Sequence, residues 1–437
     1  MNISHLYLAL FVLCVSIGYK KLKVHAAKCY EIGPCVHGSE DVSLYREGFV
    51  FVSVGLQMEA NENEVEFGSI MGIQIINEND GVEIQYQNLT IEANKMPKYF
   101  RPHGMFIANA SIDDDSLDDT TRDRLFVISH ESMYNDNEQV NEESIFVFDI
   151  VPQNGNNETS LNWPTLELKY KLKSSIFPKQ WFLNDLVVLP KLSNQESYEL
   201  FVTQCWGIVD ESMTNPRCGE KWIYHCTWLE SSNYTDSEGV NSIDMDCSKA
   251  ISRSTNGCYN GIALSPDASQ LWINDIRSRI LVAYDISTSI SNEGGNRENV
   301  NESLRLSADF ASEKEIDKTM QEPKLIRTLI RKEENDMKLG VPLTRVDNIE
   351  FDYSSGNIIM ADMVWGWVVS VPILDLNAQT TFMNIDAITI APLSDPSPSV
   401  AVYTKGVSVV GFRDKGPVLY CVGQPKLSLY TIPITWI

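Results

Sequence analysis

Four short polar pairs stand at the start of four apolar segments of the sequence. The pairs are Glu40-Asp41, Asn184-Asp185, Asn260-Gly261 and Asp347-Asn348. Each segment is expected to form the first strand of a hairpin, over residues 41–44, 185–189, 261–264 and 348–351. If these strands surround a common axis, their oxygen-bearing side chains converge at one end. Carboxylate and carboxamide oxygens without Cys or His are typical ligands of a hard cation, and Ca²⁺ suits them best.

Five of these residues form the candidate set for one ion. They are Glu40, Asn184, Asn260, Asp347 and Asn348. Two carboxylates and three carboxamides would leave coordination positions for water or substrate. Each residue alone is also explained as a turn residue at a strand end, where Asn and Asp are common. Their repetition at matching positions favours the metal site.

Two aspartates directly follow members of the first set. Because neighbouring strand residues point to opposite faces, Asp41 and Asp185 could bind a second cation. A backbone carbonyl near Met105 would complete that second site. Two ordinary turn aspartates are the alternative interpretation.

Two histidines are placed to act as a pair. His103 lies at the start of an expected inner strand, and His130 lies at the end of the next strand. A hydrogen-bonded pair of imidazoles could deprotonate a water molecule near neutral pH, whereas polar filling is the alternative role. No GxSxG elbow, HExxH helix, Walker loop or dinucleotide fingerprint occurs in the sequence. Hydrolysis would therefore depend on a metal and an activated water rather than on a covalent serine.

The elements that must position these residues are short strands. Period-2 apolar segments separated by turn residues dominate, most clearly over 259–286, 347–373 and 102–150. Further units begin near Glu40, Leu183 and Asp386. Six such units predict an all-β, six-bladed β-propeller, and a pair of β-sandwiches is the alternative. Cys29 near the start and Cys421 near the end could close the ring.

The chain divides into three parts on this interpretation. Residues 1–27 are a signal peptide or signal-anchor, 28–423 the propeller, and 424–437 a C-terminal extension. Within the propeller, residues 287–340 are expected to form a long polar insert loop with a short helix around 324–336.

Composition and charge restrict the class of partner. The 437 residues are 43% hydrophobic and carry a formal net charge of −24, which argues against nucleic-acid binding because that function needs a basic surface. The apolar run 6–17 resembles a secretory signal, and a retained anchor competes with that interpretation. The body of the protein is expected to be secreted, or anchored to a membrane and facing the lumen or exterior. The same segment could contact a membrane or lipoprotein surface.

The cysteines and glycosylation sequons agree with a secretory location. Eight cysteines remain besides Cys14, an even number that suggests up to four disulfides, and a zinc site is less favoured because no CxxC partner occurs. Five Asn-x-Ser/Thr sequons are expected in surface loops, at Asn88, Asn109, Asn157, Asn233 and Asn301.

Taken together, these motifs resemble the serum paraoxonase/arylesterase family. The matching strings are Gly38-Ser39-Glu40-Asp41, Pro102-His103-Gly104, Leu183-Asn184-Asp185-Leu186, Asn260-Gly261-Ile262, Ser265-Pro266-Asp267, Val346-Asp347-Asn348-Ile349 and Leu419-Tyr420-Cys421. They occur in the family's order across most of 29–421. The resemblance implies a six-bladed propeller with two Ca²⁺ ions in its tunnel and a ring-closing disulfide between Cys29 and Cys421.

The resemblance also implies a role for each candidate residue. Glu40, Asn184, Asn260, Asp347 and Asn348 correspond to the ligands of a catalytic calcium, whereas Asp41, Asp185 and the Met105 carbonyl correspond to those of a structural calcium. His103 and His130 correspond to the family's proposed histidine dyad.

Three functions follow as hypotheses. The first is a calcium-dependent hydrolase of small aryl esters and lactones, an arylesterase or lactonase. The second is a non-catalytic propeller of the same family that serves as a chaperone or accessory subunit for membrane proteins. The third is a gluconolactonase-like propeller, which usually lacks the ring-closing cysteines.

Overall fold

The computed structural model describes residues 27–31, 38–55, 68–78, 81–91, 100–108, 122–130, 143–152, 163–177, 183–189, 197–205, 221–229, 240–253, 258–276, 280–286, 324–330, 346–352, 357–362, 367–372, 382–386, 388–392, 398–405, 407–412, 415–421 and 431–436. The expected signal segment up to residue 26 and the sequons at Asn109, Asn157, Asn233 and Asn301 lie outside these residues. No helix in the described part of the chain is long and apolar enough to cross a membrane.

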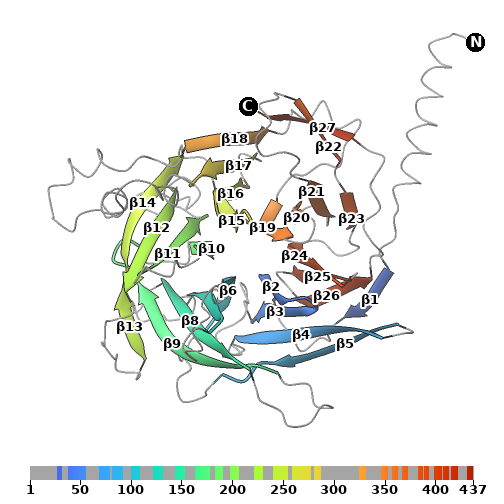
Figure 1. Ribbon diagram of the computed structural model, residues 1–437, viewed down its shortest axis with the longest axis horizontal. Helices are drawn as coiled ribbons and strands as arrows, with labels where there is room; N and C mark the ends of the chain where they lie inside the picture. Colours follow the sequence, from blue (N-terminus) through green and yellow to red (C-terminus); the bar gives the residue numbers. More distant parts are fainter. Residues whose placement is uncertain are drawn as a thin grey trace, which may run out of the picture.

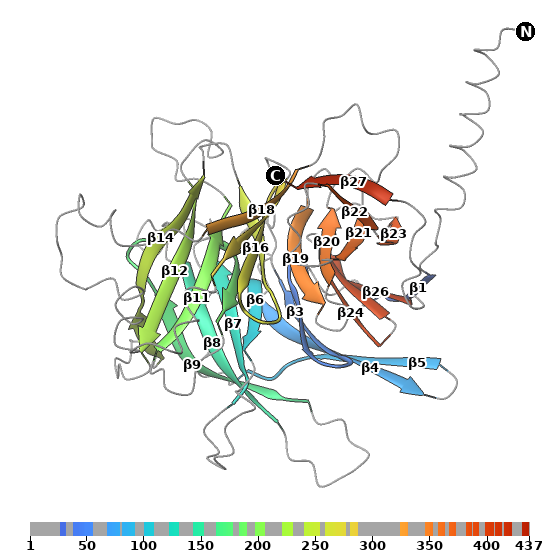
Figure 2. The same ribbon diagram turned by 45° about the horizontal axis from the view of Figure 1, so that its top comes forward.

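The strands of these described residues form six sheets around a common centre (Figures 1 and 2). The first sheet contains β2 (Val42–Arg46), β3 (Phe49–Val54), β4 (Ser69–Glu78) and β5 (Gly81–Asn88). The second contains β6 (Pro102–Ala108), β7 (Arg124–His130), β8 (Glu143–Val151) and β9 (Thr165–Lys173), with β13 (Asn241–Asp244) added parallel to β9. The third contains β10 (Leu183–Val188), β11 (Ser197–Gln204), β12 (Lys221–Leu229) and β14 (Asp246–Arg253).

The C-terminal half supplies the other three sheets. The fourth contains β15 (Tyr259–Leu264), β16 (Gln270–Asp275), β17 (Ile280–Asp285), β18 (Lys324–Ile330), β27 (Thr431–Trp436) and β22 (Phe382–Asp386). The fifth contains β19 (Val346–Asp352), β20 (Asn357–Asp362), β21 (Trp367–Pro372) and β23 (Ile388–Pro392). The last contains β24 (Pro398–Thr404), β25 (Val407–Phe412), β26 (Lys415–Cys421) and β1 (Ala27–Glu31).

The first strand of each sheet lies nearest the centre. These inner strands contact one another in a closed cycle, from β2 to β6, β10, β15, β19 and β24 and back to β2. An antiparallel sheet exposes edges, and placing sheets radially around an axis leaves only short ones. The prediction of an all-β chain with a propeller arrangement is confirmed.

The apolar core lies between neighbouring sheets rather than at the centre. One cluster joins the second sheet to the third through residues such as Phe126, Ile145 and Leu200. Another joins the last sheet to the first through Val52 and Val409. Because neighbours cover both faces, β10, β15 and β16 are buried along their whole length instead of alternating. The polar side chains on the inner strands are therefore held by rigid, fully packed elements.

The two ends of the propeller meet in one sheet. Strand β1 pairs antiparallel with β26, so that Lys28 faces Tyr420 and Ala27 faces Cys421, and the register shifts between Lys28 and Tyr30. The backbone thus puts Cys29 on the strand beside Cys421. The side chains of both cysteines lie outside the described part of the structure, and their disulfide stays a prediction.

The expected start of the sixth unit near Asp386 is wrong. Asp386 ends β22, which pairs with β27 at the outer edge of the fourth sheet. The sixth inner strand is instead β24, from Pro398 to Thr404. Both segments contain alternating apolar residues, and only the partner strand decides which of them faces the centre.

The polar insert contains a strand where a helix was expected. Lys324–Ile330 is β18, and it pairs with β17 on one side and β27 on the other. The expected helix over 324–336 is therefore wrong, because the open edge of β17 offers this segment tertiary hydrogen bonds that override its local propensity. The expected C-terminal extension likewise contributes β27 to the same sheet.

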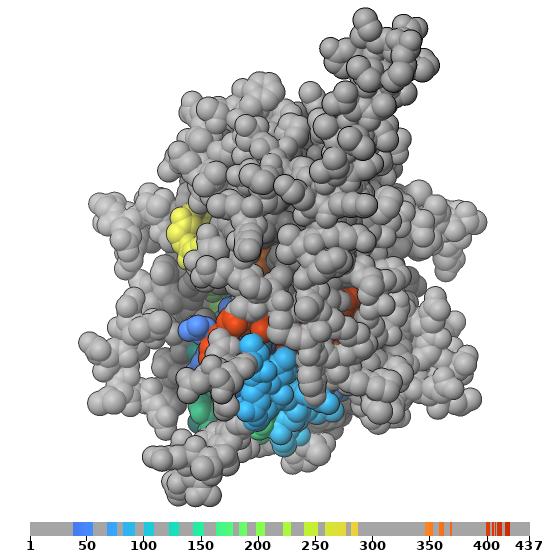
Figure 3. All heavy atoms as spheres, turned by 90° about the vertical axis from the view of Figure 1, so that its right-hand side faces the viewer, coloured from blue at the N-terminus to red at the C-terminus, as the bar shows by residue number. Residues whose placement is uncertain are grey.

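The outer surface of the first sheet carries the one sequon among the described residues. In Figure 3 the light-blue atoms of β4 and β5 lie at the molecular surface. Asn88 ends β5 and is exposed, and its side-chain oxygen accepts a hydrogen bond from Ser69 Oγ at 3.3 Å. Its position on the exterior is compatible with the expected glycan.

Candidate functional site

The same irregularity recurs in four inner strands. The register of each strand against its neighbour shifts between Pro102 and Met105, Leu183 and Leu186, Tyr259 and Ile262, and Val346 and Ile349. These short intervals contain His103, Asn184, Asn260, Asp347 and Asn348. A β-bulge interrupts the ladder and turns side chains out of the regular alternation. The bulges therefore explain how consecutive polar residues on one strand reach the centre.

Glycines let the inner strands approach one another at this level. A Cβ atom on Gly104 would lie 2.4 Å from the backbone oxygen of Asn184. A Cβ on Gly261 would lie 2.4 Å from the backbone nitrogen of Ile349 and 2.7 Å from the Cα of Asn348. Any other residue would push the ligand-bearing strands apart. Close packing of the inner strands thus requires the glycine of the Pro-His-Gly motif and that of the Asn-Gly motif.

Side chains from the second strands bind the backbone at the starts of the inner strands. Ser53 Oγ accepts the Asp41 N–H at 2.8 Å, and Thr203 Oγ1 accepts the Asp185 N–H at 3.0 Å. Asn274 accepts the Gly261 N–H at 2.6 Å and donates through Nδ2 to the Val346 carbonyl at 2.8 Å. These side chains bind backbone N–H and C=O groups that have no partner in the regular strand ladder. The bonds fix the direction of the inner strands.

The five residues expected to bind the first cation are buried, and hydrogen bonds link four of them, all but Asn184. Asn260 Nδ2 donates to Asp347 Oδ1 at 2.7 Å, and Asn348 Nδ2 donates to the Glu40 carbonyl at 3.3 Å. The hydroxyl of Ser399 lies 2.7 Å from Asp347 Oδ2 and also contacts Glu40 Oε2. One hydroxyl proton serves only one of these two carboxylates at a time. The cluster as a whole is therefore rich in acceptors.

Three carboxamide oxygens of this cluster lack a partner. Asn184 Oδ1, Asn260 Oδ1 and Asn348 Oδ1 are buried without a hydrogen bond. Exchanging the oxygen and nitrogen of Asn260 would set its oxygen against Asp347 Oδ1, so the orientation is fixed by its neighbour. Leaving a buried acceptor unsatisfied costs about 1–3 kcal/mol, so such atoms call for an explanation. A bound cation would satisfy all three oxygens at once.

The residue types of the cluster fit a hard cation and not a thiolate or imidazole site. The described residues hold no group of three or more His, Cys, Asp or Glu side chains that could bind a metal ion. The cluster contains only two such side chains, Glu40 and Asp347, with amide oxygens as the remaining donors. Ca²⁺ accepts amide and carboxylate oxygens together, with six to eight ligands in a flexible geometry. The five protein ligands would leave one or more of these coordination positions for water or substrate.

Asp41 and Asp185 occupy a second buried position. Asp41 accepts the Val42 N–H at 2.8 Å and the Met105 N–H, whereas Asp185 accepts the Leu186 N–H at 2.8 Å and the Ile262 N–H at 3.0 Å. Burial raises the pKa of Asp41 to about 7 and the pKa of Asp185 well above its ordinary value. The charge of Asp41 adds to the rise at Asp185, so the two carboxyls lie close enough to interact.

The carbonyl of Met105, expected to be a ligand, accepts a hydrogen bond from Ser43 Oγ at 3.2 Å. A carbonyl oxygen has two lone pairs, so this hydrogen bond does not by itself prevent the oxygen from binding a cation.

His103 and His130 form a buried pair. His130 Nε2 lies 2.8 Å from His103 Nδ1, and the ring centroids are 4.8 Å apart. His130 Nδ1 lies 2.9 Å from Glu143 Oε2. Burial lowers the pKa of His130 to about 3, with an opposing contribution from Glu40 and a reinforcing one from Arg101. His130 is therefore a neutral imidazole near pH 7.

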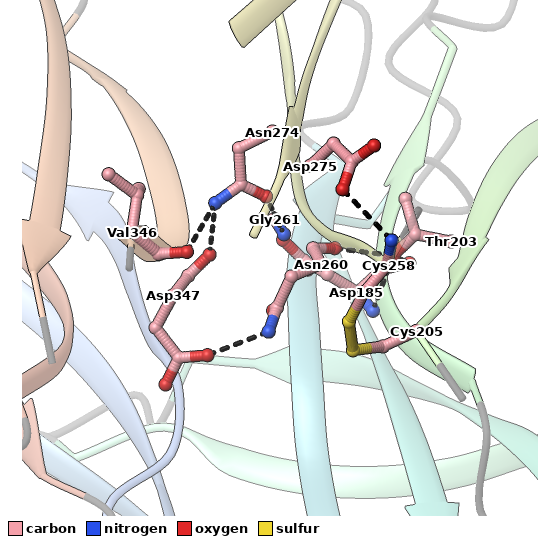
Figure 4. Close-up of a disulfide and its surroundings, with 10 residues drawn as sticks. All are labelled: Asp185, Thr203, Cys205, Cys258, Asn260, Gly261, Asn274, Asp275, Val346 and Asp347. Atoms are coloured by element: carbon pink, nitrogen blue, oxygen red, sulfur yellow. Dashed lines mark hydrogen bonds between the residues drawn. A yellow bond between two sulfur atoms is a disulfide. The ribbon is translucent and has the colours of Figure 1, made fainter. Parts of the chain in front are cut away.

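A disulfide borders the cluster (Figure 4). Cys205 and Cys258 join the end of β11 to the start of β15, two residues before Asn260. Thr203 Oγ1 contacts the Asn260 carbonyl at 2.5 Å from the same strand end. A second disulfide, Cys226–Cys247, joins the neighbouring strands β12 and β14. The first disulfide ties two ligand-bearing sheets together, and the second lies within one sheet.

Sequence reasoning did not find several residues of this site. They are Ser53, Glu143, Thr203, Asn274 and Ser399. Four of them lie on second or third strands, where no repeated motif marks them. Ser399 follows Pro398 at the start of β24, and the misplaced sixth strand hid it.

Comparisons with known proteins give no family. No family model matches the chain, and no curated protein matches it. The solved structure of a luciferin-regenerating enzyme is similar at a TM-score of 0.36 and 9% sequence identity, covering 94% of this chain and 97% of the other.

Proposed function

We propose that this protein is a calcium-dependent hydrolase of small aryl esters and lactones. The observation that carries the proposal is the set of three unsatisfied buried carboxamide oxygens beside two carboxylates at one level of the inner strands. Glu40, Asn184, Asn260, Asp347 and Asn348 would hold the catalytic ion. Asp41, Asp185 and the Met105 carbonyl would hold a structural ion.

The framework of the proposal is a six-bladed propeller. Each of the six sheets is taken as one blade, although β13 extends the second sheet and β22 and β27 extend the fourth. The ring is closed by β1 on β26, and a Cys29–Cys421 disulfide would fix that closure. The two disulfides among the described residues support an oxidising compartment, as expected for a secreted or lumenal protein.

The bound ion would supply an electrophile that polarises the ester carbonyl and stabilises the oxyanion formed from it. The protein's own residues do the remaining work. The histidine pair takes a proton from the attacking water and returns it to the leaving oxygen, so that ester and water become acid and alcohol. The packed strands β6 and β7 hold the pair rigidly, which limits reorganisation during the reaction.

Purified protein should be assayed with phenyl acetate and a medium-chain lactone, with and without chelator. Turnover should disappear with chelator and return with calcium. Asp347→Ala should lose calcium and activity together. His103→Gln should keep calcium and lose roughly 100- to 10,000-fold in kcat. Asp267→Asn, in the turn between β15 and β16, is the matched control and should behave like the parent.

Two results would contradict the proposal. One is turnover that does not depend on calcium. The other is calcium-loaded, folded protein without turnover, which would favour the accessory-subunit hypothesis.

A further inference from the structure

Glu143 is a buried carboxylate that the expected catalytic pair does not include. It is the first residue of β8, and in the antiparallel ladder it lies directly opposite His130, the last residue of β7. Its side chain is fully buried, at 0% exposure, and that of His130 is 2% exposed. A carboxylate is rarely fully buried without a specific partner.

The side chains of Glu143, His130 and His103 form one chain of hydrogen bonds. Both Glu143 oxygens approach His130 Nδ1, at 2.9 and 3.2 Å. On the other side of the ring, His130 Nε2 lies 2.8 Å from His103 Nδ1. The backbone N–H of Leu183, which precedes the expected ligand Asn184, also donates to the Glu143 carboxylate. Glu143 is thus fixed from a neighbouring inner strand.

The direction of each hydrogen bond follows from the chemistry of the groups. Burial raises the pKa of Glu143 well above its ordinary value, and the N–H of Leu183 opposes that rise. In its ionised form Glu143 only accepts, so His130 donates from Nδ1–H, whereas a protonated Glu143 would donate to His130 Nδ1 and reverse the hydrogen bonds. A neutral imidazole carries one N–H, which makes His130 Nε2 an acceptor and His103 Nδ1 the donor to it. His103 Nε2 then keeps its lone pair. That nitrogen is the base the proposed reaction needs.

We propose that Glu143 is the positioning residue of the histidine pair, fixing both rings as Nδ1–H tautomers so that His103 Nε2 is the basic nitrogen. The tautomers are inferred from the hydrogen-bond geometry. The role of His103 Nε2 as a base rests on the proposed function. Without the carboxylate, the Nδ1–H of His130 would lose its acceptor. The donor and acceptor roles in the hydrogen bond between the two histidines would then reverse. His103 would be protonated at Nε2 and unable to accept a proton there.

The test is a two-bond ¹H–¹⁵N correlation spectrum of calcium-loaded protein with ¹⁵N-labelled histidine. His103→Gln and His130→Gln assign the two rings. The parent should show both as Nδ1–H tautomers. Glu143→Leu should convert both to Nε2–H, and kcat should fall roughly 100-fold or more while KM and calcium affinity stay near those of the parent. Glu143→Gln, whose amide oxygen still accepts, should retain the tautomers and stay within about tenfold of the parent in kcat.

Glu199→Leu is the matched control, because Glu199 Oε2 lies 3.3 Å from His225 Nε2 on the neighbouring sheet. It should leave the spectra of His103 and His130 and the activity unchanged. A parent His103 protonated at Nε2, or a Glu143→Leu variant that keeps Nδ1–H on His103, would overturn the inference. The spectra need no turnover. If both rings are Nδ1–H tautomers but the protein has no esterase activity, the proposed function is contradicted, whereas the positioning role of Glu143 is supported.

Discussion

At the scale of single residues, the site is a buried set of oxygens that the protein satisfies only in part. Asn260 and Asn348 use their amide nitrogens on Asp347 and on the Glu40 backbone, while their oxygens stay without partners. Folding leaves such atoms unsatisfied at a cost of about 1–3 kcal/mol each. The metal-free protein is therefore expected to be strained by the same atoms that bind the ion.

Replacing one orphaned amide tests this point. In chelator, Asn348→Leu should be at least as stable as the parent, because Leu removes the unsatisfied acceptor and gives up only a long 3.3 Å hydrogen bond. The rise in Tm on adding calcium should be much smaller than in the parent. Differential scanning calorimetry measures both, with exposed Asn88→Gln as control. A variant that keeps the parent's full calcium-dependent rise would show that this oxygen is not a ligand.

The buried aspartates give the metal-free protein an unusual pH dependence. Burial, opposed by N–H bonds from Met105 and Val42, raises the pKa of Asp41 from 3.8 to about 7. The folded chain then holds the proton more tightly than the unfolded chain. The contribution of Asp41 to stability is therefore present below pH 3.8 and is lost as pH rises towards about 7. Burial acts on Asp185 in the same direction.

Urea midpoints in chelator should show this loss as the difference between the parent and Asp41→Asn across that window. Calcium should reverse the trend, since the ion displaces the protons and binds more tightly as pH rises. If the parent gained stability relative to Asp41→Asn between pH 4 and 7 in chelator, the burial argument would be wrong.

At the scale of elements, the bulged inner strands decide whether the ligands meet. Gly104→Ala should place a methyl group 2.4 Å from the Asn184 carbonyl oxygen and separate β6 from β10. Calcium affinity should fall by more than the loss of stability explains. Gly72→Ala is the matched control, because its Cβ would instead meet the Trp163 and Leu89 side chains at 2.8 and 2.9 Å.

Calorimetric titration with calcium, beside urea unfolding, separates the two effects. Gly72→Ala should lose stability and keep its calcium affinity. Equal calcium affinities in the two variants would show that strand approach does not control the site.

Sequence reasoning reached the inner strands because their polar pairs repeat, and it failed where a residue's role depends on a partner strand. Asn184 and Asp347 stand in recurrent motifs at strand starts, so their convergence could be predicted. Glu143 and Ser399 are single residues whose meaning comes from the register against His130 and from contacts across the centre. Strand β18 was missed for the same reason, since its pairing with β17 outweighs its local sequence.

At the scale of the whole molecule, the first and last strands share one sheet. Because β1 pairs with β26, Cys29 lies on the strand beside Cys421. A disulfide there would close the ring and restrict the unfolded chain over nearly its whole length, which typically contributes about 2–4 kcal/mol. Mass spectrometry of a non-reduced digest should find the Cys29 and Cys421 peptides joined. Recovery of either cysteine as a free thiol in oxidised protein would refute the closure.

The central claim is that the inner strands form two calcium sites, and equilibrium dialysis of chelator-stripped protein against radioactive calcium measures it directly. The account predicts two ions per chain, one of them lost in Asp347→Ala and the other lost in Asp185→Asn. Folded protein that binds no calcium, or variants that bind as many ions as the parent, would contradict it.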